Sequence, residues 1–152
     1  MIMIINAQYF LESGLPTSDD IREDEVTLAI RTVEQAVVKP RLGADLYSAI
    51  LSDDSHQYDE AVDGSDEVAG LKLAELHLVF GYMLYDRTRL VRYSSVVKND
   101  EHSENPSRAD VLAAAKNHWE IGWMFLENVC EFLAVPKAVM ECNNLIMGEM
   151  IW

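Results

Sequence analysis

The histidines are the residues of this chain with the most versatile chemistry, and their spacing supports no familiar site. They are His56, His77, His102 and His118, and no two lie four residues apart, the spacing that lets one helix hold zinc. The sequence also lacks HExxH and the Glu-x-x-His pair with which helical bundles hold iron. We expect His77, in a strongly apolar stretch, to lie in the core, and His118 to lie at a surface or interface.

The acidic side chains and the thiols give no catalytic set either. Glu127 and Glu131 lie four residues apart, which on a helix makes a solvated edge rather than a general acid and base. Cys130 and Cys142 form no CxxC motif and are expected as reduced thiols, with a disulfide left open. GxSxG, Walker and GxGxxG motifs are missing. We therefore expect a protein that is not an enzyme and binds no metal and no cofactor.

The composition indicates one acidic globular domain. Of the 152 residues 49% are hydrophobic, which is enough for a real core. The chain has 12 Lys and Arg against 26 Asp and Glu, a formal charge of -14. This charge either maintains solubility or suits a partner with a basic surface, and it disfavours binding to DNA phosphates or an anionic membrane. The apolar residues 1–5 lack the basic flank of a signal peptide, so we expect an intracellular protein.

Apolar periodicity predicts a mainly α fold, a small bundle of about four helices. The expected helices span about 18–38, 41–51, 67–88 and 107–134. Thr17 or Ser18 is expected to cap the first helix, Pro40 to break or kink the chain after it, and Pro136 to end the last helix. The third helix carries an apolar stripe with small residues that permit close helix contact: Val68, Leu71, Ala74, Leu78, Gly81, Tyr82 and Tyr85.

Both ends of the chain have a distinct composition. Residues 2–5 are expected to form a short strand or an extended arm. We expect one helical domain over 1–137 and an extended C-terminal tail over 138–152 that is unusually apolar for a terminus. The tail either packs on its own domain or docks on a neighbour, and we leave both alternatives open. Its candidate docking residues are Leu145, Ile146, Met147, Met150, Ile151 and Trp152.

One segment is strongly acidic. Residues 52–67 include Asp53, Asp54, Asp59 and Glu60, and no Lys or Arg occurs between Arg41 and Lys72. We expect a solvated loop here, because a charge run is usually a solvated surface. A calcium site is the alternative, although the spacing of the acidic residues does not match an EF-hand loop.

A second segment is the one basic patch of the sequence. Arg87, Arg89, Arg92 and Lys98 have no acidic residue between them. They flank the β-branched and aromatic stretch 90–98, which predicts a short β-hairpin or an extended arm. Three interpretations stay open: an exposed face that pairs with acids of its own chain, contact with DNA phosphates, or pairing with the acidic 52–67 face of an identical neighbour. The third would give a head-to-tail contact, and such contacts can close into rings.

Two runs of packing and turn residues, in this order, resemble a known family. The first run ends one helix and starts another: Glu34-Gln-Ala36, Lys39-Pro40, Leu42-Gly43 and Leu46-Tyr47. The second run, Gly70-Leu-Lys-Leu-Ala-Glu75, opens a helix that contains tyrosines. A β-like arm, a Ser/Pro loop and a long last helix follow. Over about 17–134 the chain resembles the head-tail connector (adaptor) proteins that join the capsid portal to the tail in tailed bacteriophages.

The resemblance implies a structural virion protein of the phage neck, made in the host cytoplasm. It implies a ring of about twelve identical subunits around the DNA channel, in contact with the portal protein and with a tail or stopper protein. DNA would pass through the lumen without specific binding, which the acidic balance suits. Candidate subunit-interface residues are Arg87, Arg89, Arg92, Lys98, Asp53, Asp54, Asp59 and Glu60. The alternative is a small acidic cytoplasmic helical binding module, or an inhibitor of a basic partner.

Overall fold

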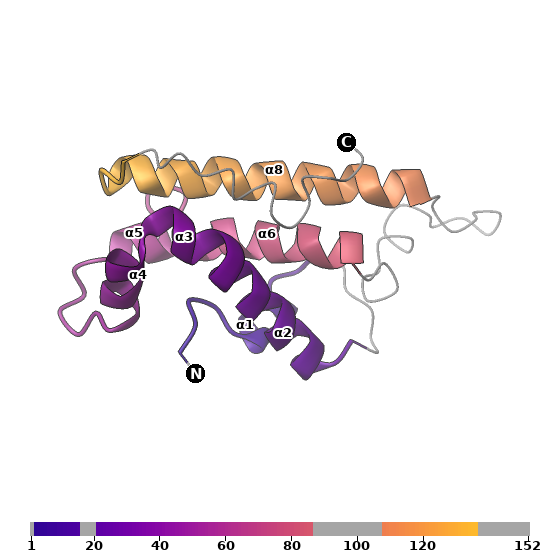
Figure 1. Cartoon of the computed structure of the whole chain (residues 1–152), viewed down its shortest axis with the longest axis horizontal. Helices are drawn as coiled ribbons and strands as arrows, with labels where there is room; N and C mark the ends of the chain where they lie inside the picture. Colours follow the sequence, from indigo (N-terminus) through magenta and orange to yellow (C-terminus); the bar gives the residue numbers. More distant parts are fainter. Residues whose placement is uncertain (1, 16–20, 87–107, 137–152) are drawn as a thin grey trace.

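The computed structural model describes residues 2–15, 21–86 and 108–136, and it confirms the mainly helical class (Figure 1). The predicted β-hairpin or arm at 90–98 and the tail at 138–152 lie outside the described residues. The elements are α1 (Ala7–Leu11), α2 (Glu23–Val33), the π-helix η1 (Glu34–Val38), α3 (Lys39–Leu42), α4 (Ala44–Leu51), α5 (Asp59–Asp63), α6 (Leu71–Asp86) and α8 (Arg108–Phe132).

The two longest helices, α6 and α8, lie side by side and run in opposite directions (Figure 1). Two glycines set how closely they approach. A methyl group on Gly81 would lie 2.9 Å from the backbone oxygen of Ala115, and one on Gly122 would lie 2.8 Å from the backbone nitrogen of Leu78. No real Cβ tolerates such distances, so only glycine fits at either position. The predicted close contact of the third helix is thereby confirmed.

Helices α2, η1 and α3 follow one another without interruption, so of the break or kink expected at Pro40 the break was wrong. A proline ring inside a regular α-helix clashes with the carbonyl four residues earlier. Here a π-helical turn comes directly before it, in which the Lys39 N–H donates to the Glu34 carbonyl, five residues back. This wider turn accommodates Pro40. The break comes at Gly43, whose φ of 92° lies in the region that favours glycine.

The first long helix also begins later than predicted. It starts at Glu23, with Arg22 in the N-cap position and no side-chain cap, whereas residue 18 was expected. Thr17 and Ser18, the expected caps, lie outside the described residues. Three acidic residues stand in the first turn, Glu23, Asp24 and Glu25, where the helix dipole favours negative charge. Electrostatic compensation therefore stabilises this helix start in place of a capping side chain.

The N-terminal residues form a segment that packs on the core, and no strand occurs among residues 2–15. Ile5 is buried, and Asn6 then caps the short helix α1 by accepting a hydrogen bond from the Tyr9 N–H at 2.8 Å. From α1, Phe10 is fully buried with its ring centre 6.4 Å from that of Phe80 on α6. No periodic pattern predicted this helix, because five residues are too few for such a pattern to show.

The acidic connection is also more ordered than a plain loop. Residues 59–63 form α5, whose Ala61 is buried against the core. Gly70, with φ of 99°, then delays the start of α6 to Leu71. A Cβ at Gly70 would lie 2.8 Å from the backbone nitrogen of Gly64, so the two glycines let the chain fold tightly back on itself. The segment predicted as a solvated loop over 52–67 is mostly exposed, but it contains a short helix that the sequence did not predict.

Candidate functional site

Two glutamates, Glu34 of η1 and Glu75 of α6, lie fully inside the molecule. Their relative exposures are 1% and 0%. Ionisable side chains are almost never buried to this extent unless they have a partner, because a charge removed from water costs several kcal/mol. Glu34 follows Val33 and precedes Val37 and Val38, which are all buried, so the helix that positions it presents an otherwise apolar face. This pair is therefore the most unusual feature of the core.

Glu34 has hydrogen-bond donors from two other parts of the chain. The Tyr47 hydroxyl of α4 donates to its Oε1 at 2.7 Å, in a buried contact. The backbone N–H of Ile4 points at both carboxylate oxygens, 3.3 Å from Oε1 and 3.2 Å from Oε2. Glu34 thus connects the N-terminal segment, the η1 turn and α4. Burial, and then the hydrogen bond to Glu34, raise the pKa of the Tyr47 hydroxyl, so it stays a donor.

Glu75 has no such donors. Burial raises its pKa well above the usual value, and the charge of the nearby Glu34 raises it further. Neither Glu75 oxygen reaches full hydrogen-bond geometry with any group in the described part of the chain. Glu34 thus acts on Glu75 through its charge, without a well-aligned hydrogen bond. The neutral acid is the form of Glu75 that this environment favours.

A second polar pair joins α6 to α8. The Nδ1 atoms of His77 and His118 lie 3.1 Å apart, and the ring planes differ by 19°. One imidazole must donate and the other accept, which requires that at least the accepting ring be neutral. Burial lowers the pKa of both, and the neighbouring His77 helps to bring that of His118 to about 4. His77 is half-buried rather than in the core, and His118, expected at a surface or interface, is also half-buried, in the contact between α6 and α8.

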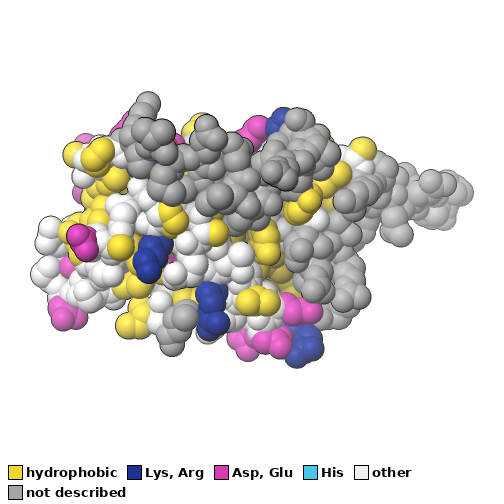
Figure 2. Space-filling model, viewed as in Figure 1, with side chains coloured by type: hydrophobic (Ala, Val, Ile, Leu, Met, Phe, Trp, Pro, Cys, Tyr) yellow, Lys and Arg dark blue, Asp and Glu magenta, His cyan; other side chains and the backbone are white. Residues whose placement is uncertain are grey.

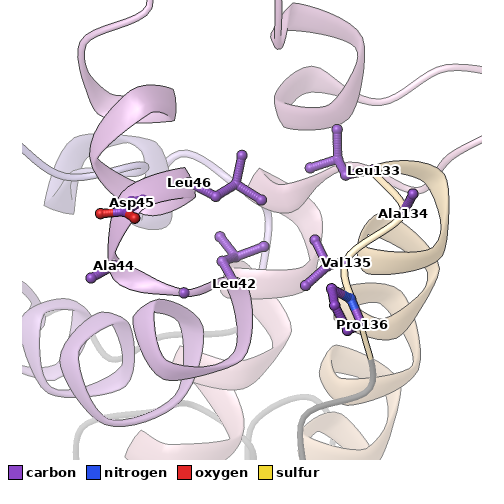
Figure 3. A pocket seen from close by; sticks show the side chains of 9 residues that line it. Leu42, Ala44, Asp45, Leu46, Leu133, Ala134, Val135 and Pro136 are labelled. Atoms are coloured by element: carbon purple, nitrogen blue, oxygen red, sulfur yellow. The ribbon is translucent and has the colours of Figure 1, made fainter.

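An open groove lies at the end of the molecule where α4 and the C-terminus of α8 meet. It has a volume of about 460 Å³. Leu42 and Leu46 face Leu133, Val135 and Pro136 across it (Figure 3). The sequence from Lys137 onward, which includes the apolar tail, begins at this rim. A partner that binds the chain just after Pro136 would therefore contact this groove first.

A buried arginine holds the same end together. Arg41 is 4% exposed and donates from Nε and Nη2 to the two oxygens of Glu127 at 2.7 and 2.8 Å. Its Nη1 donates to the Pro136 carbonyl at 3.0 Å. Such a two-pronged contact fixes geometry as well as supplying energy. Glu127, expected on a solvated edge, instead forms the tie between α3 and α8.

The four acidic candidates for the subunit interface lie together around α5. Asp54, Asp59 and Glu60 are exposed, whereas Asp53 turns toward its own loop and accepts the Tyr58 N–H at 2.7 Å. That backbone hydrogen bond is the main cause of its lowered pKa. On the visible face, acidic side chains gather over the α4–α5 end and over the start of α2 (Figure 2). The structure thus leaves three of the four as surface charges and makes Asp53 a loop-forming residue.

The remaining predicted interface residues lie outside the described ranges. These are Arg87, Arg89, Arg92 and Lys98 of the basic patch, and the tail residues Leu145, Ile146, Met147, Met150, Ile151 and Trp152. Their roles stay predictions. The described chain does fix where each segment starts: the basic patch follows the end of α6, and the tail follows Pro136.

The described side chains give no metal centre or reactive thiol. Within 2–15, 21–86 and 108–136, no three His, Cys, Asp or Glu side chains are grouped as metal ligands, so the calcium interpretation of 52–67 finds no support. Cys130 is buried and free, and its burial raises the thiol pKa to about 11, which keeps it unreactive. In the same residues, no helix is both long enough and apolar enough to cross a bilayer.

The comparisons with known proteins identify no family. The chain matches no protein-family model, and neither a curated protein nor a solved structure matches it significantly. From the sequence alone, we interpreted Glu34, Tyr47 and Glu75 only as parts of turn and packing motifs. The structure brings these three residues, from three separate segments, into one buried cluster. A glutamate among valines was the signal that could have indicated this cluster.

Proposed function

We propose that this chain is a structural subunit of the ring that connects the portal to the tail of a tailed bacteriophage. The proposal starts from the resemblance in the helix-turn motifs of residues 34–47 and 70–75. The observation that carries it is the placement of the two charged segments at opposite ends of α6. The acidic segment comes directly before Leu71, and the basic patch begins directly after Asp86.

The length of α6 separates the starts of these segments. At 1.5 Å per residue, its 16 residues span about 24 Å. A rigid helix pair, α6 against α8, maintains that separation, because Gly81 and Gly122 lock the two backbones together. Segments of opposite charge that begin at opposite ends of a rigid helix favour pairing between copies rather than within one. Repeated head to tail, this contact closes into a ring when the rotation between neighbours permits.

The acidic end offers more than charge. The exposed Asp54, Asp59 and Glu60 lie at the end of the molecule that also carries the open groove and the root of the tail (Figures 1 and 3). The tie from Arg41 to Glu127 and Pro136 keeps that end rigid. A rigid surface with charge and an apolar groove is a suitable docking face, because charge sets the register and apolar contact supplies affinity.

Native mass spectrometry of the purified full-length chain, with negative-stain images of the same sample, tests the proposal. We expect a closed ring of about twelve chains, alone or after mixing with a portal. A chain that stays monomeric or dimeric with and without a portal would refute the ring and support the alternative, a small acidic binding module. In that case binding to a basic partner in isolation should be found instead.

A charge exchange tests the pairing itself. The double variant Arg89→Glu with Arg92→Glu should lose assembly, and so should Asp59→Lys with Glu60→Lys, because each places like charges at the contact. A chain carrying all four changes should assemble again, and its assembly should weaken with salt. The matched control is Asn117→Lys with Glu120→Lys, at exposed positions in the middle of α8, which should assemble normally. Unchanged assembly of both double variants would exclude the pairing.

A further inference from the structure

The buried acid pair suggests a conformational device that does not depend on ring assembly. We propose that Glu75 keeps its proton beside Glu34, and that this proton keeps residues 2–5 bound to the core. With the proton on Glu75, the buried cluster avoids two adjacent charges, and the Glu34 carboxyl group keeps its two donors, the Tyr47 hydroxyl and the Ile4 N–H. The arrangement is then electrostatically balanced although no water reaches it.

Loss of the proton to solvent leaves two carboxylates side by side in the core. Both are at most 1% exposed, and neither oxygen of Glu75 has a well-aligned donor. Two like charges in a low-dielectric interior repel strongly, and neither can stay buried without new donors. Water is the available source of donors, so part of the structure must open to admit it. The question is which element opens most easily.

Helix α6 is not the element that moves. It is held against α8 by backbone approaches at Gly81 and Gly122 that leave no room for sliding. The tie of Arg41 to Glu127 likewise fixes α3 to the end of α8. The N-terminal segment, in contrast, has no helix or strand hydrogen bonds of its own before Asn6. Its Ile4 N–H is bound to Glu34 alone, through hydrogen bonds of 3.2 and 3.3 Å.

The surroundings of residues 2–4 also favour opening there. Ile2 is 69% exposed, and a hollow of about 230 Å³ lies between residues 2–4 and the end of α4 at Ile50 and Leu51. Asp53, Asp59, Asp63 and Lys72 line the same hollow, so it is polar enough to hold water. Detachment of residues 2–4 would therefore connect the carboxyl pair to a hydrated site at the cost of few contacts.

Other titratable groups around the pair do not compete for this role. Tyr47 touches Glu34, but burial and that contact raise its pKa, so it stays protonated where a carboxylic acid titrates. Lys39 lies above the Tyr47 ring, with its Nζ 5.9 Å from the ring centre. In the described residues, Glu75 is the member of the cluster whose pKa is raised well above 4.5 by burial and by Glu34. Its deprotonation is therefore the event that the device responds to.

Nuclear magnetic resonance of the full-length protein tests the proposal. The side-chain carbon signals of Glu34 and Glu75 report the proton, and the exchange protection of the Ile4 amide reports attachment of the segment. We expect one proton to leave the pair well above pH 4.5. Over the same pH range the Ile4 protection factor should fall by up to about tenfold per pH unit, because release is coupled to one proton. Protection of α8 amides should stay constant.

Glu75→Gln provides the decisive variant, because glutamine keeps the shape of the neutral acid but cannot ionise. Its Ile4 protection should remain high and independent of pH. Glu120→Gln, at an exposed position on α8, is the matched control and should behave as the natural chain does. Constant Ile4 protection while Glu75 ionises would overturn the proposal, and so would a pH-dependent loss that persists in Glu75→Gln. If Glu75→Gln does not fold, the two signals of the natural chain decide alone.

Discussion

Glu75 and His77 are two residues apart on α6, yet they belong to polar sites that differ in burial, partners and response to acid. Two residues correspond to more than half a helical turn, so the side chains point to opposite faces. Glu75 points toward η1 and α4, where it is fully buried beside Glu34. His77 points toward α8, where it is half-buried against His118. Helix α6 therefore carries two titratable contacts whose contributions to stability change with pH in opposite directions.

The carboxyl side is stabilised by acid. The folded state raises the pKa of Glu75 above 4.5, mainly through burial and then through Glu34. The favourable contribution of its proton is complete below pH 4.5, its unfolded value, and is lost as the pH rises through the raised folded pKa. Alkaline conditions thus weaken the contact of α6 with η1 and the N-terminal segment.

The histidine side is weakened by acid. Burial, and then the neighbouring His77, lower the pKa of His118 from 6.5 to about 4. Its contribution is present above pH 6.5 and is lost as the pH falls toward about 4. Helix α6 is therefore held most firmly on both faces in an intermediate pH range. Neither pair alone would produce such an optimum.

Glu34→Leu should have the largest effect on this balance. It removes the acceptor of the Tyr47 hydroxyl and the Ile4 N–H and leaves both donors buried without a partner. We expect the free energy of unfolding to fall by about 3 kcal/mol. Urea unfolding followed by circular dichroism measures it. Glu120→Leu on the exposed face of α8 should change stability by less than about 0.5 kcal/mol. Equal losses in the two variants would contradict a special role for Glu34.

Gly122→Ala should act on the other face of α6. The added methyl group would lie 2.8 Å from the Leu78 backbone nitrogen, so α8 must move away and His77 and His118 must separate. We expect a loss of about 2 kcal/mol, as for other overpacked contacts. The exposed Asn117→Ala on the same helix is the control, with a change within about 0.5 kcal/mol. Thermal unfolding of both variants makes the comparison.

Glu75→Met should stabilise the protein, in contrast to Glu34→Leu. Glu75 has no well-aligned donor to lose, and methionine fills a similar volume without the cost of burying a carboxyl group. We expect a gain of about 1 kcal/mol at pH 7. The gain should be larger at pH 8 than at pH 5, because only the natural residue is forced to ionise. A loss at pH 8 in urea unfolding would mean that Glu75 has a stabilising partner.

His118→Phe should have the smallest effect at neutral pH and a visible one in acid. Phenylalanine keeps the edge-to-face contact with Phe80, whose ring centre is 4.6 Å from that of His118. It cannot be protonated, so the loss of stability between pH 6.5 and about 4 should shrink. The midpoint of acid unfolding should move to lower pH. An unchanged midpoint would show that the histidine pair does not set the acid limit.

The helices that could be predicted from the sequence are those with long apolar stripes. Residues 71–86 and 108–132 fall close to the predicted spans, and Gly81 was expected to permit close contact. Their periodicity is strong because one continuous face packs along the full length of each helix. The later start at Glu23 and the passage through Pro40 were not predictable. Both depend on electrostatics and on a π-helical turn that leave no periodic trace.

The polar contacts were harder still, because their partners lie far apart in the sequence. Arg41 and Glu127 are separated by 86 positions, and His77 and His118 by 41. No spacing rule links such residues before the helices are placed in space. A glutamate next to Val33 and ahead of Val37 and Val38 is a local inconsistency in an apolar face. That kind of inconsistency is the one sequence sign of a buried polar partner.

The pH dependence of the unfolding free energy from pH 4 to pH 9, for the natural chain and for Glu75→Gln, tests the comparison most directly. For the natural chain we predict a maximum with stability falling on both sides. In Glu75→Gln the alkaline fall should disappear and the acidic fall should remain, since His77 and His118 are untouched. Superimposable profiles of the two proteins would contradict the claim that the two faces of α6 titrate in opposite directions.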